Sequence, residues 1–286
     1  MVNNKKYVLI LGFFDGIHIG HRKVISEAVS YAKHNGVKTA MLTFPKSPAE
    51  YYNKNFEYLY PRNFNYEIIK SLGVDEIYQT EFSELADITA KDYLKKIVSD
   101  YLPIAIYTGY NYTFGAGRGG NSDTLRLYSN ELNYKYFSVE NVVMGGESVC
   151  STLIKEKIKS GLIEDANILL GKNFSIKSKV IEGAKIGRML GFPTANMNYP
   201  NGIVRLPYGV YKVKTMDKPA ILNWGIKPTL MSKEPVLEVH IPDFDGDLYG
   251  QNLTIEFLSK LRDEKAFNSV EELKEQIKRD LKQCLE

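Results

Sequence analysis

The stretch GFFDGIHIGH, Gly12 to His21, constrains the fold of this 286-residue chain more than any other. It follows a short apolar run at 7–11 and precedes apolar residues at helical spacing, namely Val24, Ile25, Ala28, Val29 and Ala32. This order predicts a strand, a glycine-containing turn and a helix that begins near Gly20. Because glycines let backbone N–H groups approach a ligand and a helix N-terminus attracts anions, we expect the turn to bind phosphate.

Two of the four histidines of the chain, His18 and His21, lie in this turn. Their spacing places both imidazoles on one face of the helix start, where they can donate hydrogen bonds to a phosphoryl group. A structural role for such a pair is the alternative. We take both as candidate catalytic residues.

Composition limits the classes of protein to consider. The length suits two domains, and 44% hydrophobic with 25% charged residues is typical of a soluble globular protein. A net charge of +3 is too small to indicate a nucleic-acid partner. Cys150 and Cys284 form neither a metal-ligand pattern nor a disulfide framework, so we expect a cytoplasmic protein. The apolar stretch YVLILGFF, at 7–14, has no cleavage site and leads directly into Asp15, so we expect no signal peptide and no membrane contact.

The first half of the chain alternates between strand and helix patterns. Strands are predicted at 37–44, 76–79 and 104–107, helices at 66–72 and 90–101, and a long loop or lid at 45–65. The first strand, helix and second strand form a parallel βαβ unit. The fold class is therefore α/β, with a doubly wound parallel sheet.

Two further segments of this half carry candidate binding residues. TGYNYTFGAGRGGN, at 108–121, has five glycines and follows a strand at the edge where such sheets bind ligands; a flexible surface loop is the alternative. VCSTLIKEKIKSG, at 149–161, offers the hydroxyls of Ser151 and Thr152 at a helix start, either as caps or as donors, and a cation one turn later at Lys155.

The sequence changes character after a helical connector at 163–171. Short β-prone segments follow at 176–181, 208–215, 220–223, 236–241 and 253–257, and an amphipathic helix at 269–285 ends the chain. This pattern predicts a small antiparallel barrel with a C-terminal helix. We place the boundary near 165–172, which gives domains at 1–165 and 172–286.

The barrel contains VIEGAKIGRMLGFPTAN, at 180–196. Gly183, Gly187 and Arg188 are suited to a phosphate-binding loop, although glycine-rich segments also form ordinary turns. The Thr194 hydroxyl and the Asn196 amide oxygen are ligands suited to a hard cation.

Taken together, the motifs of the first half resemble those of the nucleotidyltransferase superfamily, and specifically the FAD synthetase module of the bacterial bifunctional riboflavin kinase/FAD synthetase family. The resemblance implies a Rossmann-like, HIGH-type domain. It also implies nucleotide or phosphate contacts from Gly12, Phe14, Asp15, Gly20, Asn111, Arg118, Ser151, Thr152 and Lys155. The chain departs from the family pattern in four places, with Pro45-Lys46-Ser47-Pro48 for Pro-His-Pro, Tyr112 for phenylalanine, Cys150 for serine and Lys155 for arginine.

The second half resembles the riboflavin kinase module of the same family. After 180–196 come Asn223-x-Gly-x-x-Pro228-Thr229, LEVHIPDFDGDLYG at 237–250, and Leu261-Arg262. The resemblance implies that Thr194 and Asn196 bind Mg²⁺ and nucleotide and that Glu238 is the general base. It also implies nucleotide contacts from Gly183, Gly187 and Arg188, and flavin contacts from Asn223 and Arg262.

This resemblance covers nearly the whole chain and implies a bifunctional enzyme that phosphorylates riboflavin to FMN and adenylylates FMN to FAD, with ATP as co-substrate in both steps. We expect a monomer or weak homo-oligomer. One alternative is a monofunctional FAD synthetase with a weak or regulatory kinase-like module. The others are a kinase without adenylyltransferase activity and a flavin-binding protein without turnover.

Overall fold

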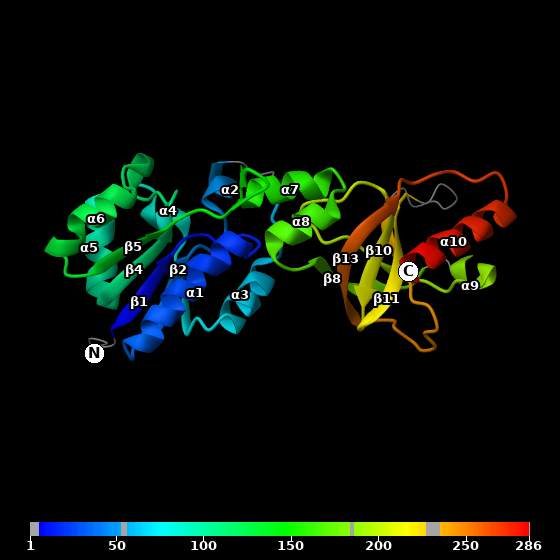
Figure 1. Cartoon of the computed structure of the whole chain (residues 1–286), viewed down its shortest axis with the longest axis horizontal. Helices are drawn as coiled ribbons and strands as arrows, with labels where there is room; N and C mark the ends of the chain where they lie inside the picture. The colour runs from blue at the N-terminus through cyan, green and yellow to red at the C-terminus, as the bar shows by residue number, and fades with distance from the viewer. Residues whose placement is uncertain (1–5, 53–55, 184–185, 227–234, 286) are drawn as a thin grey trace. The chain divides into compact units, whose positions relative to one another are not determined.

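A computed structural model describes residues 6–52, 56–183, 186–226 and 235–285 of the chain. The chain divides into two compact units, Met1–Ser151 and Thr152–Glu286 (Figure 1). We describe each unit by itself.

The first unit contains a parallel sheet of five strands in the order β3-β2-β1-β4-β5. The strands are β1 (Tyr7–Leu11), β2 (Lys38–Thr43), β3 (Glu76–Gln79), β4 (Pro103–Gly109) and β5 (Lys135–Val139). The chain leaves β1 towards β2 and later returns to its other side as β4. In open α/β sheets, ligands usually bind where the strand order reverses, here at the carboxyl ends of β1 and β4 beside the turn after β1.

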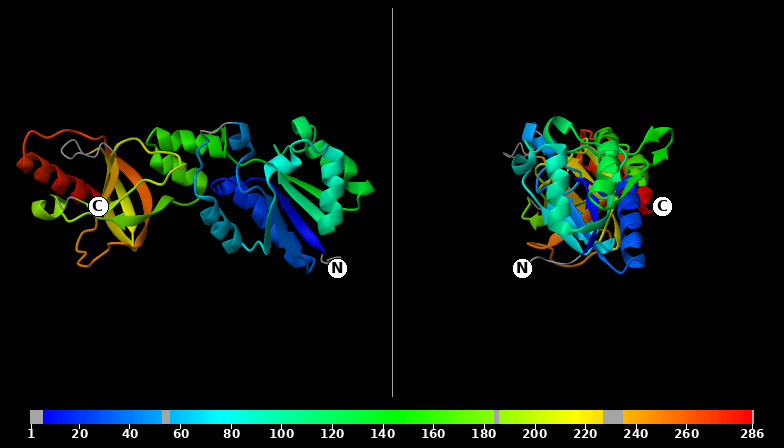
Figure 2. Two further views of the ribbon diagram at one scale, coloured as in Figure 1. Left: turned by 180° about the vertical axis from the view of Figure 1, so that it is seen from behind. Right: turned by 90° about the vertical axis from the view of Figure 1, so that its left-hand side faces the viewer.

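Helices cover both faces of this sheet (Figure 2). They are α1 (Ile19–His34), α2 (Pro48–Tyr52), α3 (Arg62–Ser71), α4 (Phe82–Leu85), α5 (Ala90–Tyr101) and α6 (Ser122–Glu131). All five residues of β1 are buried, and alternate ones enter two different cores. Val8 and Ile10 pack with α1 and α3, whereas Leu9 and Leu11 pack with α5 and α6. Because β1 is buried on both faces, it needs apolar residues at every position and shows no alternation of apolar and polar residues.

Most predicted elements of this unit are observed within a few residues, but the segment at 45–65 differs. It contains α2 and the first turn of α3, where a loop was predicted. Pro48 is the first residue of α2, where proline is common, and Pro61 directly precedes α3 as its N-cap. The sequence analysis also did not predict α6, β5 or the short hairpin of β6 (Val143–Met144) and β7 (Glu147–Ser148).

The second unit contains a closed six-stranded barrel in the order β10-β11-β12-β9-β8-β13. Its strands are β8 (Phe174–Ile181), β9 (Ala195–Met197), β10 (Gly209–Thr215), β11 (Lys218–Gly225), β12 (Val236–His240) and β13 (Asn252–Arg262). Neighbouring strands pair antiparallel, and β13 pairs with β10 to close the barrel. Trp224 is buried in it and donates through Nε1 to the Leu206 carbonyl at 3.1 Å.

The helices of the described part of this unit are α7 (Ser151–Lys159), whose first residue still belongs to the first unit, α8 (Ile163–Leu170), α9 (Ile186–Leu190) and α10 (Val270–Leu285). Of these, α8 packs against β13 and α10 packs against β11. The compact unit thus begins at Thr152, ahead of the change in sequence character at 165–172, and α8 packs against the barrel strands β8 and β13. The proposed functional domains at 1–165 and 172–286 stay a prediction.

Candidate active sites

The turn after β1 is shaped by close contacts around its glycines. Gly16 has a φ of +84°, in the region that favours glycine, and a Cβ there would collide with Leu59. At Gly12, a Cβ would lie 2.7 Å from the Phe14 ring. A Cβ on Gly20 would lie 3.2 Å from the His18 ring, at the start of α1. Glycine at these positions allows the turn and the helix start to fold closely together.

His18 and His21 form a stacked pair at the N-terminus of α1. Their ring centroids lie 3.6 Å apart, and His18 Nδ1 accepts a hydrogen bond from the His21 backbone N–H at 3.3 Å. His18 therefore carries its proton on Nε2, the atom with which it can donate to a ligand. Within the described part of the chain, His21 Nδ1 is buried without a hydrogen-bond partner.

Burial keeps both imidazoles neutral. It lowers the pKa of His18 to about 4, and it lowers the pKa of His21 well below its ordinary value, with a further contribution from His18. Two stacked rings cannot both be cationic without strong repulsion. Near neutral pH the pair can therefore donate neutral N–H groups to a phosphoryl oxygen.

Phe14 and Asp15 make contacts within the protein. The Phe14 ring packs edge-on against His21, with centroids 5.1 Å apart. The buried Asp15 carboxylate accepts from the Leu59 backbone N–H at 3.0 Å, and the Asp15 carbonyl accepts from the Ser151 hydroxyl at 2.9 Å. These two residues and Ser151 shape the turn. Their direct contact with nucleotide stays a prediction.

Thr152 and Lys155 follow Ser151 on α7 and belong to the second compact unit. Their contribution to phosphate binding therefore stays a prediction.

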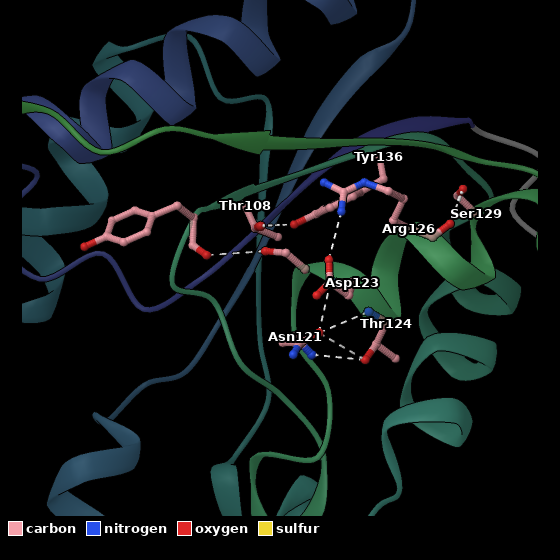
Figure 3. Close-up of polar contacts among 9 residues, drawn as sticks. Thr108, Asn121, Asp123, Thr124, Arg126, Ser129 and Tyr136 are labelled. Atoms are coloured by element: carbon pink, nitrogen blue, oxygen red, sulfur yellow. Dashed lines mark hydrogen bonds and ion pairs between the residues drawn. The ribbon is translucent and has the colours of Figure 1, made fainter.

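The segment after β4 reaches the same carboxyl edge of the sheet. Asn111 and Arg118 are exposed on it, and Arg118 Nε donates to the Thr113 hydroxyl at 3.1 Å. Figure 3 shows how the segment is anchored: the Thr108 and Tyr136 hydroxyls lie 2.9 Å apart, and the Asn121 side chain accepts from the first turn of α6. The anchored ends present a loop with two exposed polar side chains.

The sequence analysis missed residues that hold the turn from α3. Arg62 donates to the Phe13 carbonyl at 3.1 Å, and the fully buried Asn65 accepts from the Gly16 N–H at 3.3 Å. Both lie about fifty positions after the turn, in a segment without clear periodicity. Only the proline before Arg62, a helix-start signal, could have drawn attention to them.

The barrel brings three predicted residues together in adjacent strands. Glu238 of β12 is in register with Asn223 of β11 on one side and with Asn196 of β9 on the other. Side chains in register on neighbouring strands lie on the same face, with Cβ atoms about 5 Å apart. A carboxylate between two amides is suited to accept a proton from a hydroxyl group that the amides orient.

The predicted cation ligands lie against the glycine-rich segment. A Cβ on Gly183 would lie 2.5 Å from the Asn196 side chain, and one on Gly187 would lie 3.2 Å from the Thr194 hydroxyl and collide with the Phe192 carbonyl. The Asn196 amide nitrogen donates to the Thr194 carbonyl at 3.3 Å, so its amide oxygen is the atom suited to a cation. This set of a hydroxyl and an amide oxygen beside a carboxylate fits Mg²⁺.

A cavity of about 630 Å³ adjoins this cluster. Thr194 and Arg188 line it together with the segment 244–249, whose carboxylates are Asp245 and Asp247. A cavity of this volume accommodates a ligand of nucleotide size.

The structure engages Arg262 within the protein. Its guanidinium donates through Nε and Nη2 to the buried Asp280 carboxylate of α10, at 3.0 and 2.8 Å. Such a forked pair fixes the end of β13 to α10. The predicted flavin contact of Arg262 stays a prediction, and Pro228 and Thr229 lie outside the described residues.

An α/β unit with a glycine-containing turn and stacked histidines at its switch point, followed by a barrel with a carboxylate, an amide and a hydroxyl beside a nucleotide-sized cavity, is the arrangement expected of a two-site nucleotide-dependent transferase. The FAD synthetase family matches residues 1–153 and the riboflavin kinase family matches residues 170–286. The chain belongs to the family of bifunctional riboflavin kinase/FMN adenylyltransferases.

Relatives of the same description extend over nearly the whole chain. The bifunctional riboflavin kinase/FMN adenylyltransferase of Bacillus subtilis is 32% identical over 98% of this chain and 92% of its own length. The enzyme of the same description from Buchnera aphidicola subsp. Schizaphis graminum is 34% identical over 97% of this chain and 93% of its own length. A crystal structure of a macrolide-efflux protein from Streptococcus pneumoniae is 28% identical, with a TM-score of 0.89 over 98% of this chain and 94% of that one. Among the described residues, no helix of this chain is long and apolar enough to cross a membrane.

Proposed function

We propose that this chain converts riboflavin to FMN in its barrel unit and FMN to FAD in its α/β unit, using one ATP in each step. The observation that supports this proposal best is that each unit carries its own set of reactive groups. The stacked histidines lie at a helix N-terminus in one unit, and Glu238 lies between Asn196 and Asn223 in the other.

In the barrel, Glu238 accepts the proton of the riboflavin 5′-hydroxyl as its oxygen attacks the γ-phosphorus of ATP. A new oxygen–phosphorus bond forms, the bond to the β,γ-bridging oxygen breaks, and ADP leaves. Asn223 orients the hydroxyl from the neighbouring strand. Thr194 and Asn196 would hold Mg²⁺, which when bound would neutralise phosphate charge.

In the α/β unit, an FMN phosphate oxygen attacks the α-phosphorus of ATP, and pyrophosphate leaves. The nucleophile is already anionic, so this step needs no general base. His18 and His21 donate hydrogen bonds to the charge that develops, and the N-terminus of α1 adds its positive end. Asn111 and Arg118 contact the nucleotide or its phosphates in this proposal.

The same proposal places the enzyme in the cytoplasm as a monomer or weak homo-oligomer. The two free cysteines, Cys150 and Cys284, support a reducing compartment.

The test is to incubate purified protein with ATP and Mg²⁺ plus either riboflavin or FMN, and to separate the flavins over time. We expect FAD from both incubations, with transient FMN in the first. FAD from FMN alone would indicate a monofunctional synthetase, and FMN accumulating without FAD would indicate a kinase alone. The absence of any turnover would contradict both activities.

A further inference from the structure

Arg62 connects three segments at the carboxyl edge of the sheet. Its Nη1 donates to the Phe13 carbonyl at 3.1 Å, and its Nη2 donates to the Phe44 carbonyl at 2.9 Å and to the Thr43 hydroxyl at 3.2 Å. Phe13 belongs to the turn after β1, and the other two acceptors lie at the end of β2. One guanidinium on α3 thus ties the turn to the neighbouring strand.

The guanidinium also lies over two aromatic rings. Its carbon is 4.1 Å from the centroid of the Phe13 ring and 4.8 Å from that of the Tyr66 ring. Aromatic neighbours together with oxygen acceptors at its edge suit the planar fork of arginine, which lysine lacks. Within the described ranges, Arg62 has no carboxylate partner. Its hydrogen-bond acceptors are two backbone carbonyls and one hydroxyl, which are all neutral. These contacts therefore fix the orientation of the guanidinium and form no ion pair.

The contacts from this part of the chain continue along the turn. The Leu59 N–H donates to the Asp15 carboxylate at 3.0 Å, and Asn65 accepts from the Gly16 N–H at 3.3 Å. Together with the Arg62 contact to Phe13, residues 59–65 hold three of four successive positions of the turn. Those positions lead directly into the N-cap His18 and thus into the stacked pair.

We propose that Arg62 is a positioning residue for adenylyl transfer. By fixing the Phe13 carbonyl against the end of β2, it holds the turn that places His18 and His21 opposite the reacting phosphate. This inference rests on the adenylyltransferase activity proposed above and adds a residue to it. This role depends on the planar guanidinium and its aromatic contacts, so a lysine of the same charge should not substitute for Arg62.

The experiment compares Arg62→Lys with the wild-type protein in single-turnover formation of FAD from FMN at saturating ATP, with ATP affinity measured separately. We expect the rate constant to fall about ten- to a hundredfold, since a misplaced catalytic group costs on this order. ATP affinity should change by less than about threefold, because the misplacement affects the transition state more than ground-state binding. Riboflavin phosphorylation and the melting temperature should stay as in the wild type.

Two further variants sharpen the test. Valine is similar in shape to threonine, so Thr43→Val removes one of the three oxygens that accept from Arg62. We expect this variant to lower the same rate constant by less than Arg62→Lys does. Arg126→Lys is the matched control, because Arg126 lies exposed on α6 with an Asp123 partner, and it should leave the rate unchanged. Hydrogen exchange of the amides at 13–17 should be faster in Arg62→Lys than in Arg126→Lys.

Each contrary result has a definite meaning. If Arg62→Lys retains the wild-type rate while Arg62→Gln loses it, the charge alone suffices and the positioning role is wrong. A lower melting temperature with an unchanged single-turnover rate would make Arg62 merely structural and would equally overturn it. Failure of the wild-type protein to form FAD would instead contradict the adenylyltransferase function itself.

Discussion

Glu238 is the residue on which the proposed phosphorylation of riboflavin depends. Its register between Asn196 and Asn223 places the carboxylate among groups that can orient a hydroxyl and a cation. We expect Glu238→Gln to lower riboflavin phosphorylation by about a hundredfold to ten-thousandfold, the usual contribution of a general base. FAD formation from supplied FMN should persist, and flavin chromatography measures both.

Glu275→Gln provides the control for this variant. Glu275 lies exposed on α10 with Lys278 as its partner, so its substitution should leave phosphorylation unchanged. Loss of both activities in Glu238→Gln would point to misfolding and contradict the assignment.

At the scale of elements, the short helix α9 lies directly against Thr194, one of the predicted cation ligands. Alanine usually stabilises a helix relative to glycine by about 0.5–1 kcal/mol. At Gly187, however, a Cβ would collide with the Phe192 carbonyl and crowd the Thr194 hydroxyl. We therefore expect Gly187→Ala to lower riboflavin phosphorylation at least tenfold, about 1.4 kcal/mol in the barrier, by displacing Thr194, and to weaken its dependence on Mg²⁺.

The measurement is phosphorylation rate against Mg²⁺ concentration, with FMN adenylylation in the same sample as the control. An unchanged Mg²⁺ dependence would mean that the close approach of α9 to Thr194 does not matter for the cation.

At the scale of the whole molecule, the two units should respond differently to acid. The folded α/β unit holds His18 with a pKa of about 4, whereas the unfolded chain binds that proton near the ordinary value of 6.5. The neutral His18 side chain therefore contributes its full stabilisation at pH values above 6.5. This contribution is lost as the pH falls from 6.5 towards 4. The linkage predicts a loss of about 2 kcal/mol in the free energy of unfolding between pH 7 and pH 5, and His21 adds to it.

Trp224, the single tryptophan of the chain, lies in the barrel and separates the two responses. Denaturant unfolding followed by its fluorescence reports the barrel, whereas circular dichroism reports both units. We expect the pH-dependent loss of stability in the part of the circular dichroism transition that Trp224 fluorescence does not report. In a His18→Gln, His21→Gln double variant, the free energy of unfolding should depend less on pH. An equal loss in that variant would contradict the prediction.

Much of the fold could be predicted from local signals. The apolar run at 7–11 and the helix at 90–101 were predicted at their observed bounds, because buried strands and amphipathic helices leave a periodic pattern in the sequence. The closed barrel was predicted from short β-prone segments separated by turns. The helix α2 and the start of α3 were not, because the short, tyrosine-rich segment around them carries no sustained period.

The sequence by itself determined the α/β and barrel architecture and the family, and it predicted the types of residue at each proposed site, because these depend on short motifs read along the chain. Only the tertiary structure decided which side chains meet. It placed Asn223 and Asn196 beside Glu238 through strand register, and Arg62 against Phe13 through the packing of α3. It also engaged Arg262 with Asp280. Contacts between residues tens of positions apart depend on how elements pack, and local sequence patterns carry no record of that packing.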